Sequence, residues 1–97
     1  VPLVEGVRGL AGAGFVTGAS ARNWAAYGHE VQLPAHFGAA DQALLSDPQT
    51  SGGLLVSCTP EAVPAVLAVF RRHGFDGAAD IGAVRQAEPQ VGLRVAI

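Results

Sequence analysis

The clearest hydrophobic pattern in the chain lies between Thr59 and Gly74. Thr59 and Pro60 are typical of a helix start, the basic residues 71–73 suit the last turn, and Gly74 is typical of a helix end. Pro64 is expected to remove one backbone hydrogen bond and kink the second turn. The helix is expected to carry a single apolar stripe, because apolar residues recur at i, i+3, i+4 and i+7: Val63, Val66, Leu67 and Phe70.

Weaker patterns predict three further helices. Each combines apolar or small residues with a capping residue or a helix breaker. They are residues 3–12, ending at Gly12 or Gly14; residues 21–27, with Ser20 as N-cap and Gly28 as the stop; and residues 39–45, which Pro48 prevents from continuing.

Four short apolar runs predict extended segments, at 30–34, 54–58, 78–84 and 91–97. In the last run Leu93, Val95 and Ile97 alternate with other residues, so one face of that strand is expected to be covered. This order of helices and strands predicts an α+β fold, with a small mixed or antiparallel sheet backed by helices. The 97 residues suffice for one domain, expected over 1–97.

Composition narrows the function classes. Of the residues, 49% are hydrophobic and 14% charged, and eight acids against six arginines leave a net charge of −2. The chain lacks lysine and any basic cluster, which argues against nucleic-acid binding and against a Walker or Schiff-base lysine. No apolar run is long enough for a membrane span. The single cysteine, Cys58, is expected to be a small buried hydrophobe in a reducing cytoplasm. The absence of methionine suggests that Val1 is the cut end of a longer protein.

Familiar catalytic motifs do not fit. Gly12 and Gly14 are followed by Thr17 where a dinucleotide-binding loop needs its third glycine. The histidines lack metal-ligand spacing, so no metal site is expected. No Gly-x-Ser-x-Gly nucleophile elbow occurs either. No catalytic residue is therefore assigned within this chain.

Two segments are candidates for binding. The first is the helix start at 20–23, where free backbone N–H groups and the guanidinium of Arg22 are suited to an anion, although an ordinary capped surface helix explains the pattern equally well. The second is the polar loop 47–53 before an apolar run. Asp47 can cap its own turn, and Gly52-Gly53 allow a ligand or another chain to approach closely. From local chemistry alone, a structural turn and a binding loop stay equally open.

At this loop the chain resembles a known family. Asp47-Pro48-Gln49-Thr50-Ser51-Gly52-Gly53-Leu54-Leu55 looks like the signature of the C-terminal half of the selenophosphate synthetases (selenide, water dikinases). Residues 17–29, from Thr17 to His29, resemble that family's Gly-Gly-Thr/Ser-x-Arg-Asn-x-x-x-Tyr-Gly segment, with Ala19 where the family often has glycine. The match continues through residues 70–84 and covers essentially the whole chain.

The resemblance implies the C-terminal domain of an enzyme in the aminoimidazole-ribonucleotide-synthase superfamily, truncated at its N-terminal side. Such enzymes use ATP, Mg²⁺, selenide and water to make selenophosphate, AMP and phosphate, and they are typically homodimers. The family's catalytic cysteine or selenocysteine, its lysine and its metal-binding aspartates lie upstream, in a nucleotide-binding domain that is absent here. The segment alone is therefore expected to be inactive, to bind no ATP or Mg²⁺, and to have its own N-terminal domain as partner.

By this interpretation the segment supplies one wall of a composite active site. The residues expected to face the substrate or phosphate come from both motifs: Arg22, Asn23, Asp47, Thr50, Ser51, Gly52 and Gly53. An alternative is a non-catalytic folding or assembly domain of a related ATP-dependent enzyme. A thiamine-monophosphate kinase or a hydrogenase-maturation protein is a third interpretation, which the 47–53 string disfavours. No nucleic acid or membrane partner is expected.

Overall fold

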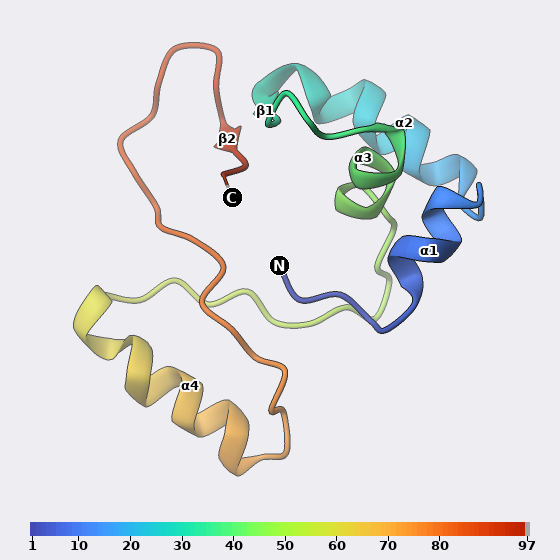
Figure 1. Ribbon diagram of the computed structural model, residues 1–97. Helices are drawn as coiled ribbons and strands as arrows, with labels where there is room; N and C mark the ends of the chain where they lie inside the picture. Colours follow the sequence, from blue (N-terminus) through green and yellow to red (C-terminus); the bar gives the residue numbers. More distant parts are fainter. Residues whose placement is uncertain (97) are drawn as a thin grey trace. The chain divides into compact units, whose positions relative to one another are not determined.

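A computed structural model describes residues 1–96 and divides the chain into two compact units. The α4 unit comprises Val1–Leu3 and Gly53–Arg85, and the helical unit comprises Val4–Gly52 and Gln86–Ile97. Helices are the main regular structure of both units (Figure 1).

The helical unit contains α1 (Val7–Gly12), α2 (Gly18–Tyr27) and α3 (Ala39–Leu45), with a 3₁₀ turn, η1 (Gly28–Glu30), directly after α2. Both α1 and α2 pack against α3 (Figure 1). An ion pair between Arg8 and Asp41 joins α1 to α3, and the Asp41 carboxylate also accepts the backbone N–H of Gly38 at the start of α3. The bounds predicted for α3 are confirmed, and α1 is shorter than predicted.

The start of α2 differs from the sequence prediction. Thr17, not Ser20, is the N-cap, because the Thr17 hydroxyl accepts the backbone N–H of Ser20. The helix therefore begins at Gly18, and Ser20 lies within its first turn, where it is buried. Both residue types are good N-caps. Only the backbone conformation, extended at Thr17, decides between them.

The sheet also differs from the prediction. It consists of β1 (Val31–Gln32) and β2 (Leu93–Arg94), which run parallel in the register Val31 to Leu93 and Gln32 to Arg94, so the expected mixed or antiparallel sheet is wrong. A parallel pair requires a long connection between its strands, and residues 33–92 supply one. The predicted extended segment at 30–34 is confirmed for the two residues of β1. The segment predicted at 91–97 is confirmed only for the two residues of β2, and Ile97 lies outside the described residues.

The apolar runs at 54–58 and 78–84 form no strand among the described residues. Leu54 and Leu55 are 82% and 80% exposed, and Cys58 is exposed as well, so the prediction that this cysteine is buried is wrong. An apolar run indicates that a segment tends to be extended, but a strand also needs a neighbour to receive its backbone hydrogen bonds.

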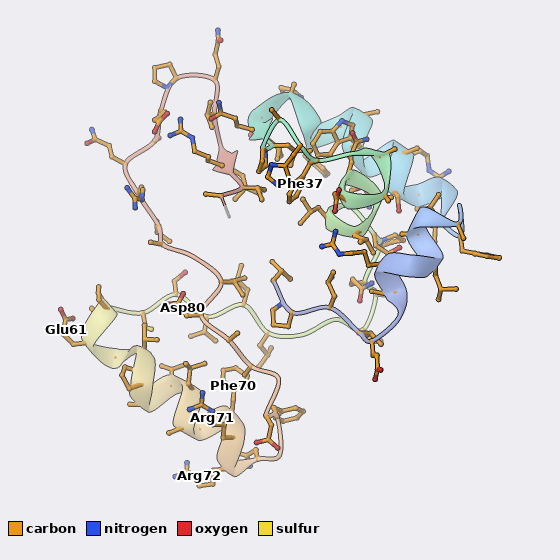
Figure 2. The ribbon with its side chains drawn as sticks, in the orientation of Figure 1. Phe37, Glu61, Phe70, Arg71, Arg72 and Asp80 are labelled. Atoms are coloured by element: carbon orange, nitrogen blue, oxygen red, sulfur yellow. The ribbon has the colours of Figure 1, made fainter. Side chains whose placement is uncertain are left out.

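The α4 unit is built on η2 (Pro60–Ala62) and α4 (Val63–Arg72). Pro64 lies in the first turn of α4, directly after η2, where its missing N–H would have no helical partner. The predicted kink stays a prediction. Glu61 lies near the start of the helix and Arg72 at its end (Figure 2). The predicted stripe is confirmed as the half-buried face of the helix, formed by Val63, Val66, Leu67 and Phe70.

Helices α1 and α4 end in the same way. In α4, Gly74 has a φ of 85°, its N–H bonds to the carbonyl of Arg71, and the N–H of Phe75 bonds to the carbonyl of Phe70 at 3.0 Å. The Phe70 and Phe75 rings then meet edge to face, 6.5 Å apart. This is a Schellman motif with its apolar contact, and Gly14 ends α1 through the same two bonds. The predicted helix end at Gly74 is confirmed.

Burial is low throughout the described residues. Ala11 and Ser20, at 7% and 4% exposure, are the residues among them classed as buried. None of the helices within 1–96 is both long and apolar enough to cross a membrane.

Candidate functional site

A cleft of about 330 Å³ lies within the helical unit, where α2, the end of α3 and the two strands converge. Its lining is mostly apolar, with a few polar groups, as in small-molecule sites. We call it the Asn23–Asp47 cleft. Helix α2 and its end contribute Asn23, Trp24, Tyr27 and Gly28; the end of α3 contributes Leu45, Ser46 and Asp47; the strands and their flanks contribute Val31, Leu93 and Val95.

Asn23 links the two sequence motifs that carried the family resemblance. Its Nδ2 group donates a hydrogen bond of 2.9 Å to the backbone carbonyl of Ser46, directly before the 47–53 loop. The Ser46 hydroxyl in turn donates to the carbonyl of Gln42, at 2.8 Å, which closes the last turn of α3. Asn23 thus helps to hold the start of the loop against α2.

Trp24 forms a second wall, and its position depends on Gly28. A Cβ placed on Gly28 would lie 2.6 Å from Cε2 of Trp24, far inside van der Waals contact. The indole therefore packs directly over the backbone at the end of α2. The sequence indicated Gly28 only as a helix stop, but its φ of −60° is ordinary helical geometry. The glycine is required because of the close approach of Trp24.

The polar loop begins inside the cleft and then leaves it. Asp47 is half-buried in the lining, and its carboxylate accepts a hydrogen bond from the Gln49 side chain. The Gly52 N–H bonds to the Gln49 carbonyl at 3.1 Å, forming a turn in which Thr50 and Ser51 are exposed. Of the predicted site residues, therefore, Asn23 and Asp47 line the cleft.

The remaining predicted residues lie elsewhere. Arg22 is exposed on α2, and its Nη1 lies 3.6 Å from the position that a Cβ on Gly18 would occupy, at the N-terminal turn of the helix. It does not line the Asn23–Asp47 cleft. Gly53 belongs to the α4 unit.

The wall that the strands contribute was not predicted from the sequence. Leu93 and Val95 come from the far end of the chain and reach the cleft through backbone hydrogen bonds to β1 and its flank. The N–H of Gly92 bonds to the Glu30 carbonyl at 2.8 Å, and the N–H of Val95 bonds to the Gln32 carbonyl at 2.9 Å. Side chains on β2 add support: Arg94 donates to both Gln32 and Glu88, each at 2.7 Å. The alternation of Leu93 and Val95 was the available signal, but it does not identify the partner strand.

Charge in the cleft is confined to one carboxylate. Among the described residues, Asp47 is the one acidic residue in the lining, and none of the others there is an arginine or a histidine. Two acidic groups elsewhere in the chain have lowered pKa values. The pKa of Asp41 is lowered by the Gly38 backbone N–H and by Arg8, and the pKa of Glu61 is lowered by its own backbone N–H and the Thr59 hydroxyl. Within residues 1–96, no three His, Cys, Asp or Glu side chains are grouped so that they could hold a metal ion.

Several curated proteins are similar to this chain. It is 61% identical over 82 residues to the selenide, water dikinase of Burkholderia pseudomallei, a match that covers 84% of this chain and 23% of that protein. It is 53% identical over 91 residues to the selenide, water dikinase of Pseudomonas straminea, and 47% identical over the same length to that of Dechloromonas aromatica, covering 94% of this chain and 26% of each relative. The chain thus spans about a quarter of these relatives. No protein-family model and no solved structure matches it.

Proposed function

Because this chain belongs by sequence to the selenide, water dikinase family, we propose that it is a segment of the C-terminal domain of such an enzyme. The whole enzyme would convert ATP, selenide and water into selenophosphate, AMP and phosphate. The segment alone would be inactive and would supply one wall of the active site.

The observation that carries this proposal is the identity of 53–61% over most of the chain. Additional support comes from Asn23 and Asp47. They belong to the two separate motifs of the family resemblance, 24 positions apart, and both line one cleft. Residues of the two motifs are therefore neighbours in the fold, as one shared wall would require. In our proposal the contact to phosphate is made by Arg22, which lies outside the cleft, and not by the cleft itself.

The reaction requires groups that these residues do not supply. Phosphoryl transfer from ATP depends on held metal ions and on cations placed around the phosphates. The described residues present no cluster of side chains that could hold Mg²⁺. In our proposal the other three quarters of the enzyme hold ATP and Mg²⁺. The proposal also includes an N-terminal domain as partner, a homodimeric enzyme and a cytoplasmic location.

A substitution at Arg22 tests the proposed contribution to the active site. In the natural full-length enzyme that carries this segment, Arg22→Ala should lower selenide-dependent AMP formation, because the guanidinium would no longer stabilise phosphate charge. Arg72→Ala is the matched control, since Arg72 lies at the end of α4, outside both motifs. Equal rates for the two variants and the unmodified enzyme would remove Arg22 from the site.

The alternative is a folding or assembly domain without a direct role in turnover. Asp47→Ala separates the two cases when soluble, folded enzyme is compared at equal concentration. A scaffold role predicts lower thermal stability with unchanged turnover per folded molecule. An active-site role predicts lower turnover in molecules that remain folded.

A further inference from the structure

The Asn23–Asp47 cleft has a chemical character that the proposed reaction does not explain. Most of its lining is apolar, and it comes from three elements: Trp24 and Tyr27 on α2, Leu45 at the end of α3, and Val31, Leu93 and Val95 at the strands. A volume of about 330 Å³ lies near the lower end of the range for small-molecule sites. The cleft is therefore suited to a small ligand with an apolar body.

The charge of the cleft disfavours an anionic ligand. Asp47 contributes a half-buried carboxylate, and within the described part of the chain neither arginine nor histidine lines the cleft to balance it. Phosphate or another anion at this position would face an uncompensated negative charge beside apolar walls, which is unfavourable. A cation there would instead compensate the carboxylate.

The hydrogen-bonding groups point to the same ligand class. Two side-chain donors of the lining are already used within the protein, because Asn23 Nδ2 donates to the Ser46 carbonyl and the Ser46 hydroxyl donates to the Gln42 carbonyl. The Asp47 carboxylate receives one hydrogen bond, from Gln49, and has further lone pairs available. The lining also holds the indole N–H of Trp24 and the hydroxyl of Tyr27, so the case for a ligand with its own N–H donors depends on the Asp47 carboxylate.

We propose that the Asn23–Asp47 cleft binds a small organic ammonium ion, with its charged group on the Asp47 carboxylate and its apolar body against Trp24 and Leu93. This inference rests on the lining of the cleft and does not depend on the proposed reaction.

A charge series on the unmodified full-length protein tests the proposal. Calorimetric titration at pH 7, without ATP or selenide, would compare 2-phenylethylammonium with its neutral analogue 2-phenylethanol and the anion phenylacetate. We expect the ammonium ion to bind about tenfold more tightly than the alcohol, and phenylacetate not to bind. Equal affinity for the ammonium ion and the alcohol, or no saturable binding of either, would overturn the proposal.

Two variants then locate the site. Asp47→Asn should lower the affinity for the ammonium ion about tenfold and leave that for the alcohol unchanged, while Asp76→Asn, in the α4 unit, should change neither. Leu93→Ala should weaken both ligands. An ammonium affinity that Asp47→Asn leaves unaltered would place the binding elsewhere. Because the titration contains no ATP or selenide, its outcome is separate from that of the AMP assay.

Discussion

Asn23 on α2 donates a hydrogen bond of 2.9 Å to the backbone carbonyl of Ser46, at the end of α3. The two residues are 23 positions apart in sequence, and the bond is partly buried. It holds together two helices that otherwise share few buried side chains, and it sets where the 47–53 loop begins.

Removing this bond should destabilise the helical unit. Asn23→Ala leaves the Ser46 carbonyl without its partner, and we expect the free energy of unfolding to fall by about 1 kcal/mol. Denaturant titration followed by circular dichroism measures the change. Gln86→Ala is a suitable control, because Gln86 is an exposed polar residue of the same unit, and it should have a much smaller effect.

Gly28 and Gly9 should respond to alanine in opposite directions. Gly28→Ala forces a Cβ into the Trp24 ring and should cost about 1–3 kcal/mol of unfolding free energy. Gly9 lies within α1, and a Cβ added there would meet no atom within 4 Å, so Gly9→Ala should stabilise the helix by about 0.5–1 kcal/mol. Thermal unfolding of both variants provides the comparison. Unchanged stability of Gly28→Ala would contradict the close packing of Trp24 on Gly28, and a loss of stability in Gly9→Ala would contradict the open space at Gly9.

The end of α4 depends on a left-handed residue. With a φ of 85° at Gly74, Gly74→Ala should reduce the unfolding free energy by about 1–2 kcal/mol, and Gly74→Asn should cost less because asparagine tolerates this conformation better. Gly77→Ala is the control, since Gly77 has open space and no positive φ. If all three variants unfold at the same temperature, Gly74 does not limit the stability of this helix end.

Acid should weaken the contact between α1 and α3. The pKa of Asp41 is lowered in the folded state by the Gly38 backbone N–H and by Arg8, with a smaller contribution from His36. The stabilisation is therefore fully present above the unfolded pKa, near 3.8, and is lost as the pH falls through the lower folded value. Unfolding measured from about pH 6 to 2 should show the difference between the unmodified chain and Asp41→Asn shrinking toward acid. A difference that stays constant over this range would show that Asp41 does not titrate with folding.

Local sequence signals were sufficient where the structure depends on neighbouring residues. The helix ending at Gly74, the stripe from Val63 to Phe70 and the helix at 39–45 follow from backbone preference and periodicity within a few turns. The choice of Thr17 over Ser20 as N-cap did not follow, because both side chains can cap and only the backbone conformation separates them.

Local sequence signals did not predict which strands pair with each other across the chain. Apolar runs at 54–58 and 91–97 look alike in sequence, yet the second contains a strand and the first does not, because Val31 and Gln32 pair with Leu93 and Arg94. For the same reason the motifs indicated Asn23 and Asp47 but not Leu93 and Val95, which complete the cleft. A residue's own preference is encoded locally, whereas its partner is selected by the backbone hydrogen bonds that only the folded chain brings together.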